Sequence, residues 1–175
     1  DIEGLGNSNI TNNGTIEASG AATFQSGANF TNADTSELSI DGAMRNEGTF
    51  SNSGGTVTVK GTTTNTGTIT NTGDFTSEGA ITNNNGGKIT NNSSGTISGD
   101  IDNTGSFENS GTIAGAITNN AGGTVTNNGG EISGEVSGEG TFENNYSTIS
   151  SDTVLDWIED SSWENGVKPN ISGKT

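Results

Sequence analysis

A short internal repeat constrains this chain more than any other feature of its sequence. Residues 101–107 read Ile-Asp-Asn-Thr-Gly-Ser-Phe, residues 107–113 read Phe-Glu-Asn-Ser-Gly-Thr-Ile, and a small corner at 114–116 leads to Ile117, where the pattern starts again. The unit is apolar, x, Asn, x, Gly, x, apolar. Two units and one corner make a cycle of about 16 to 20 residues, a period that is typical of repeat architectures.

The recurring apolar residues can be arranged in threes, as short strands separated by turn residues. The first set joins Ile10 and Ile16 to either Ile2 or Leu5. The later sets are Phe24, Phe30 and Leu38; Met44, Phe50 and Val57; Thr63, Ile69 and Phe75; Ile81, Ile89 and Ile97; Ile101, Phe107 and Ile113; Ile117, Val125 and Ile132; and Val136, Phe142 and Ile149. The pattern predicts an all-β chain, a three-sided β-helix (β-solenoid) of about eight coils over residues 1–149.

An Asn stands two residues after most first and second members of these sets. They are Asn12, Asn32, Asn46, Asn52, Asn65, Asn71, Asn83, Asn91, Asn103, Asn109, Asn119, Asn127 and Asn144. Side chains alternate along a strand, so these amides point inward too. Leaving a buried amide unpaired costs about 1–3 kcal/mol, and coils stack about 4.8 Å apart. We therefore expect the Asn of successive coils to form hydrogen-bonded ladders at two corners. The third corner is small, as at Ser98-Gly99.

Residues 150–175 lack the repeat and form a separate C-terminal segment. Ser151 or Asp152 can cap a short helix there. The apolar side chains of the segment are Val154, Leu155, Trp157, Ile158 and Trp163. Two interpretations remain open: the segment is a helical cap over the end of its own solenoid, or it is a tail that clasps a neighbouring subunit.

Three stretches resemble the repeats of filamentous-haemagglutinin-like and autotransporter-type bacterial surface adhesins. They are residues 50–57 (Phe-Ser-Asn-Ser-Gly-Gly-Thr-Val), residues 81–89 (Ile-Thr-Asn-Asn-Asn-Gly-Gly-Lys-Ile) and residues 117–125 (Ile-Thr-Asn-Asn-Ala-Gly-Gly-Thr-Val). The resemblance covers most of residues 10–149. It implies a right-handed β-helix on a bacterial surface that acts as a stalk, an adhesin or a fibre.

Charge and composition exclude several partners. The 175 residues carry a net charge of −16, from 5 basic and 21 acidic side chains, which makes nucleic acid or an anionic membrane a poor partner. There is no Cys, so no disulfide framework or thiolate metal site can form. No apolar run approaches the roughly 18 residues of a membrane span, and the chain starts at Asp1 without a Met. A processed, exported chain would start in this way, and so would an excised fragment. We expect the protein to be extracellular or on the cell surface.

The side chains offer little for catalysis. A polysaccharide lyase on this fold would need a basic residue beside carboxylates, and this chain has no His and one Arg, Arg45. We predict no enzyme activity and no cofactor. Acidic residues that stacking could bring together are weak candidates for a Ca²⁺ site: Asp100, Asp102, Glu108, Glu135, Glu139 and Glu143. The alternative is a solvated acidic face.

Two functions fit this sequence. In the first, the chain is a non-enzymatic structural subunit that associates head to tail with itself into a surface fibre, because open strand edges pair. The predicted interface residues are Ile2, Leu5, Ile10 and Ile16 at one end and Val154, Leu155, Trp157, Ile158 and Trp163 in the tail. In the second, the chain is part of an adhesin that binds glycan or a host surface through its outward Asn and Thr side chains.

Overall fold

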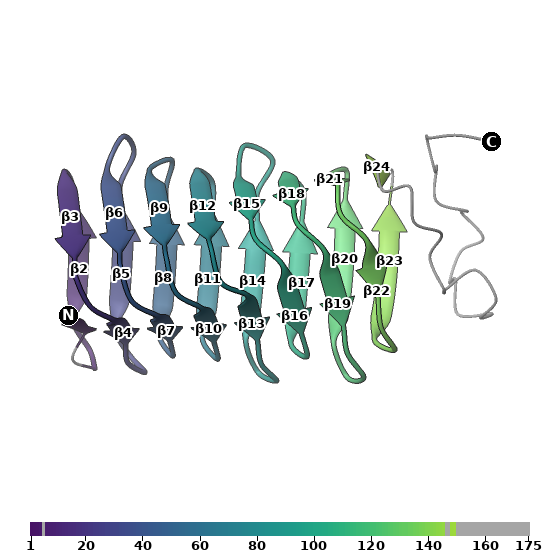
Figure 1. Ribbon diagram of the computed structural model, residues 1–175, viewed down its shortest axis with the longest axis horizontal. Helices are drawn as coiled ribbons and strands as arrows, with labels where there is room; N and C mark the ends of the chain where they lie inside the picture. The colour runs from purple at the N-terminus through teal and green to yellow at the C-terminus, as the bar shows by residue number, and fades with distance from the viewer. Residues whose placement is uncertain (5, 146–147, 150–175) are drawn as a thin grey trace.

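The computed structural model describes residues 1–4, 6–145 and 148–149, and over these residues the chain is a three-sided β-solenoid (Figure 1). Its 24 strands form three parallel sheets of eight strands each, and no helix occurs in this part of the chain. The fold predicted from the repeat is confirmed. The predicted helical segment at 150–175 lies outside the described residues.

Each sheet collects every third strand. Sheet A contains β1 (Ile2–Gly4), β4 (Ala22–Phe24), β7 (Met44–Asn46), β10 (Thr63–Asn65), β13 (Ile81–Asn83), β16 (Ile101–Asn103), β19 (Ile117–Asn119) and β22 (Val136–Ser137). Sheet B contains β2 (Asn9–Asn12), β5 (Asn29–Asn32), β8 (Thr49–Asn52), β11 (Thr68–Asn71), β14 (Lys88–Asn91), β17 (Ser106–Asn109), β20 (Thr124–Asn128) and β23 (Thr141–Asn145). Sheet C contains β3 (Thr15–Ala18), β6 (Glu37–Ile40), β9 (Thr56–Val59), β12 (Asp74–Ser77), β15 (Thr96–Ser98), β18 (Thr112–Ala114), β21 (Glu131–Ile132) and β24 (Thr148–Ile149).

Three successive strands therefore make one coil, and eight coils stack in seven steps. In Figure 1 the chain rises along sheet B on the far side and descends along sheet C on the near side while it advances from the N-terminal end. This winding is right-handed, as the resemblance implied. It is also the hand that parallel strand crossovers adopt almost always.

The core is a continuous column of the predicted inward residues, and most of these side chains are buried. The predicted alignment of the second coil was wrong. We predicted Phe24 as the first inward residue of its set, but strand pairing aligns Ala22 with Met44 and Phe24 with Asn46. Both Ala22 and Phe24 point inward, because they are two residues apart on one strand. Phe24 therefore occupies the position that Asn holds in the later coils.

Sheet C contributes inward positions that the sequence pattern did not reveal. Ala18, Ile40, Val59 and Ser77 stack on one another at the ends of the first four strands of this sheet, and all four are buried. In the fifth coil Gly99 lies over Ser77, where an added Cβ would come 2.6 Å from the Ser77 carbonyl oxygen. The core is therefore wider in the first four coils than in the later ones.

Candidate functional site

The longest polar feature is the Asn ladder of sheet B. In seven successive bonds, the side-chain Nδ2 of each Asn donates to Oδ1 of the Asn one coil further on, over 2.8 to 3.0 Å. Its members are Asn12, Asn32, Asn52, Asn71, Asn91, Asn109, Asn127 and Asn144. Each Nδ2 bond points toward the C-terminal end, so the ladder has a direction.

Each inner amide in the ladder also forms hydrogen bonds with backbone groups of the turn that follows it. Nδ2 of Asn109 donates to the carbonyl oxygens of Gly111 at 3.2 Å and Glu131 at 3.3 Å, besides Oδ1 of Asn127. Its Oδ1 accepts from Nδ2 of Asn91 at 2.9 Å and from the backbone N–H of Gly111 at 3.2 Å. These backbone partners fix which way the amide faces. The ladder is thus bonded both between coils and within them.

A second, shorter ladder runs through sheet A. It joins Asn46, Asn65, Asn83, Asn103 and Asn119 through four bonds of 2.8 Å, with the same direction as in sheet B. All thirteen Asn predicted to point inward are buried, so that prediction is confirmed.

The sheet A ladder stops short of both ends of the solenoid. At its beginning, Phe24 takes the Asn position, and the buried Oδ1 of Asn46 has no hydrogen-bond partner. At the other end of this ladder, Ser137 pairs with Thr118, and the next residue, Gly138, lies against the backbone of Asn119. Glycine therefore stands where a further Asn would continue the ladder. Its φ is +109°, a conformation that favours glycine. Only the sheet B ladder begins in the first coil and reaches the last.

The first coil is an edge of all three sheets. Strands β1, β2 and β3 each pair on one side only within the described part of the chain. Ile2, Ile10 and Ile16 pack against the core but are only partly buried. These are three of the predicted interface residues. The fourth, Leu5, and the tail residues Val154, Leu155, Trp157, Ile158 and Trp163 lie outside the described residues.

The predicted Ca²⁺ ligands are not gathered into one group. Asp102 faces outward from sheet A, whereas Glu108 and Glu143 face outward from sheet B on strands separated by β20. Asp100, Glu135 and Glu139 lie at corners between strands. Asp100 accepts a hydrogen bond from the backbone N–H of Ala116 at 2.9 Å. Among the described residues no three His, Cys, Asp or Glu side chains form a group that could hold a metal ion.

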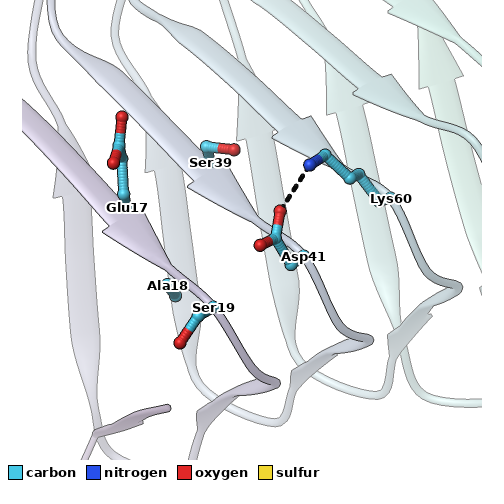
Figure 2. Close-up of a pocket in the computed structure, with 6 residues that line it drawn as sticks. All are labelled: Glu17, Ala18, Ser19, Ser39, Asp41 and Lys60. Carbon is cyan, nitrogen blue, oxygen red and sulfur yellow. Dashed lines mark ion pairs between the residues drawn. The ribbon is translucent and has the colours of Figure 1, made fainter.

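A shallow hollow of about 340 Å³ lies on the outer side of the first three coils (Figure 2). It is lined by Glu17, Ala18, Ser19, Ser39, Asp41 and Lys60. Figure 2 shows the Lys60 ammonium turned toward the Asp41 carboxylate, with Glu17 set apart from the pair. The Nζ to Oδ1 distance is 2.6 Å. This hydrogen bond and the charge of Asp41 hold the pKa of Lys60 above its ordinary value of 10.5. A lysine held protonated in this way cannot act as a base near neutral pH.

Each cationic side chain in the described part of the chain has an acidic partner. Arg45 pairs with Glu47 at 2.6 Å, Lys60 with Asp41 at 2.6 Å, and Lys88 with Glu108 at 3.0 Å. All six side chains are 32% to 59% exposed, so these pairs add little to stability. In the described part of the chain, acidic side chains therefore outnumber the basic ones, and no basic side chain lacks an acidic partner.

The outer face of sheet B is uncharged over its first four coils. Its outward residues there are Asn9, Thr11, Asn29, Thr31, Thr49, Ser51, Thr68 and Thr70. They form two rows, aligned from coil to coil by the strand register. Charge begins in the fifth coil, at Lys88.

No protein-family model, no curated protein and no solved structure matches this chain. In the part of the chain that the structure describes, no helix is both long enough and apolar enough to cross a membrane.

Proposed function

We propose that this chain is a non-enzymatic, extracellular structural protein that stacks end to end with further copies of itself into a fibre at the cell surface. The observation that supports the proposal best is the first coil. Its inner side chains Ile2, Ile10 and Ile16 are partly exposed, and its three strands have an unpaired edge among the described residues. Such an edge is a template for another strand.

Stacking would repeat the contacts that already hold the solenoid together. Each coil is bound to the next by parallel strand pairing on all three sides, by apolar side chains and by an Asn bond. A further copy on the first coil would bury the three Ile side chains in the same way. Because the two ends of the solenoid differ, such a contact does not close on itself, and repetition gives a filament.

Surface charge favours stacking at the ends over association along the sides. The net charge is −16, and the described cations are all paired with acids. Parallel acidic rods repel each other along their whole length. Contact at an end brings fewer of these charges together.

Negative-stain electron microscopy of the purified chain tests this function. We expect thin unbranched fibres, one solenoid wide, that lengthen as the protein concentration rises. A second sample that ends at residue 149 distinguishes the two interpretations of the tail. Loss of fibres on truncation identifies the tail as a clasp, and longer or more numerous fibres identify it as a cap. Single short rods at every concentration, with or without the tail, contradict the proposal.

A second candidate function is binding of a glycan or a host surface through the outward Asn and Thr side chains. The uncharged rows over the first four coils of sheet B favour it, because hydroxyl and amide groups can bond a neutral carbohydrate without facing like charges. Screening of the monomer against immobilised glycans tests it. Binding that is lost on Thr31→Ala and Thr70→Ala, but kept on Thr118→Ala on sheet A, would support this function over the fibre.

A further inference from the structure

We infer that Asn85 is a site of spontaneous modification, at which the side-chain amide is lost through attack by the backbone nitrogen of Gly86. The inference goes beyond the proposed function and does not rest on it. Glycine favours this reaction, because it has no Cβ to hinder the approach of its nitrogen to the preceding side chain. The chain contains four Asn-Gly pairs: Asn13-Gly14, Asn85-Gly86, Asn128-Gly129 and Asn165-Gly166. The last pair lies outside the described residues, and the structure distinguishes the other three.

The reaction consumes one water molecule and releases one ammonia molecule. The Gly86 nitrogen gives up its proton and attacks Cγ of Asn85, which closes a succinimide ring. The side-chain nitrogen takes up a proton and leaves as ammonia. Water then opens the ring at one of its two carbonyl groups. Opening at the side-chain carbonyl gives Asp, and opening at the backbone carbonyl gives isoaspartate, so either product carries a new carboxylate.

The turn that holds Asn85 leaves both reacting groups available. Residues 84–87 connect β13 to β14, and the turn is closed by a hydrogen bond of 2.8 Å from the Gly87 N–H to the Asn84 carbonyl oxygen. Asn85 and Gly86 form its exposed tip, at the lower edge of Figure 1. Within the described part of the chain, neither the Asn85 side chain nor the Gly86 N–H has a hydrogen-bond partner. The Gly86 nitrogen can therefore approach the side chain without first breaking a bond.

The other two described pairs hold the attacking nitrogen in place. The N–H of Gly14 donates to Oδ1 of Asn12 at 3.1 Å. The N–H of Gly129 donates to the carbonyl oxygen of Asn145 at 2.9 Å, and Oδ1 of Asn128 accepts Nδ2 of Asn145 at 3.1 Å. A nitrogen whose N–H is engaged in this way can attack only after a local opening of the structure. Exposure alone therefore does not make these two pairs reactive.

The turn does not depend on its Asn. Turns closed by the same type of hydrogen bond occur in the second and seventh coils, at residues 25–28 and 120–123. The third residue of each is a Gly with a φ of +84° or +88°, against +85° in the turn of Asn85. The position of Asn85 is held by Ser26 in one and by Ala121 in the other. Asn85→Ala is therefore a matched variant that keeps the turn and removes the reacting amide.

Peptide mapping of the full chain by mass spectrometry tests the inference. One sample is kept folded at mildly alkaline pH and body temperature, and a second is kept in guanidinium under otherwise equal conditions. Both are digested with trypsin after set times, and a sample digested at once gives the background. Trypsin places Asn13 and Asn85 in different peptides, and fragmentation separates Asn128 from Asn165. Isoaspartate identifies the succinimide route, because direct hydrolysis of the amide gives Asp alone.

In the folded chain we expect Asn85 to react at least about tenfold faster than Asn13 or Asn128, because their glycine N–H groups must first open. In guanidinium the three rates should become similar, since no turn remains. Asn85→Ala should lose the early acidic species that the parent chain gives on ion exchange. Equal rates in the folded chain, or no isoaspartate at Asn85, would overturn the inference. An equal preference for Asn85 in guanidinium would also overturn it, because the selection would then lie in the sequence and not in the turn.

Discussion

At the scale of single residues, the inward Asn is the group that holds neighbouring coils in register. Asn109 contributes five hydrogen bonds: two to other ladder Asn, two to carbonyl oxygens and one from a backbone N–H. Four of these bonds are buried, and the one to the Glu131 carbonyl oxygen is part-buried, at a corner where two coils and a turn meet. Removing the amide leaves several buried polar groups without partners, and each costs about 1–3 kcal/mol.

We expect Asn109→Leu to lower the free energy of unfolding by at least about 3 kcal/mol, because Leu fills the space but satisfies none of these groups. Urea unfolding followed by circular dichroism measures the change. The matched control is Asn29→Thr on the outer face of sheet B, where Asn29 donates to Asn9 at 2.9 Å in solvent. This control should change stability by less than about 0.5 kcal/mol. Equal effects of the two substitutions would contradict the role assigned to the ladder.

Phe24 shows that packing can replace the ladder locally. Its ring lies 4.8 Å from the ring of Phe30 and 5.2 Å from that of Phe50, at the cost of a donor for Oδ1 of Asn46. Phe24→Asn would supply that donor, for about 1 kcal/mol, and would remove a buried aromatic ring, for about 3–5 kcal/mol. We therefore expect Phe24→Asn to destabilise the chain by about 2–4 kcal/mol. Unchanged or higher stability in urea unfolding would mean that the ladder, and not the aromatic cluster, dominates in this coil.

The inward Asn could be predicted from the sequence because their spacing leaves one consistent alternation. The register of the second coil could not be predicted from the sequence. Ala22 and Phe24 are both apolar and two residues apart, so either can be read as the first inward residue without changing the face. Strand pairing with Met44 and Asn46 decides between them. For the same reason Ile40 and Val59 escaped prediction, since each follows an inward Leu or Val by two.

At the scale of strands and coils, the elements are short and depend on their neighbours. Most strands have three or four residues, too few to be stable alone. Each coil is repeated with the same pairing, so the stability of the body is close to a sum over coils and the contacts between them. The body should then tolerate the loss of a whole coil far better than a shift within one.

Removal of residues 88–105, which make up one whole coil, tests whether the body tolerates the loss of a coil. The deletion joins Gly87 to Ser106, and because Lys88 pairs with Ser106 in the native register, every inward position keeps its phase. We expect a folded protein whose urea m-value falls by roughly one eighth, since buried area scales with the number of coils. Removal of residues 88–98 is the control, because it takes out β14 and β15 but leaves β16, the third strand of the same coil, in place. It should unfold the chain or abolish cooperative unfolding, and a native-like melt for it would contradict the coil as the unit.

At the scale of the whole molecule, the chain is an acidic rod with unlike ends. The fold and its three sides could be predicted from the repeat, because the period and the alternation specify them together. Whether acidic residues gather into a metal site could not be predicted from the repeat. Residues that are close in sequence, such as Asp102 and Glu108, lie on different sheets. The direction of the Asn ladder could not be predicted either, because it depends on which atom of each amide faces the next coil.

The axial repeat of the fibre, measured by electron cryomicroscopy, tests the central claim most directly. Eight coils at about 4.8 Å give a rise of about 38 Å for each subunit, with all subunits pointing the same way, if copies stack head to tail without a gap. We predict this rise, together with continuous strand spacing across the junction. A repeat of about twice this length with two-fold axes across the fibre, or solenoid axes lying perpendicular to it, would contradict the account.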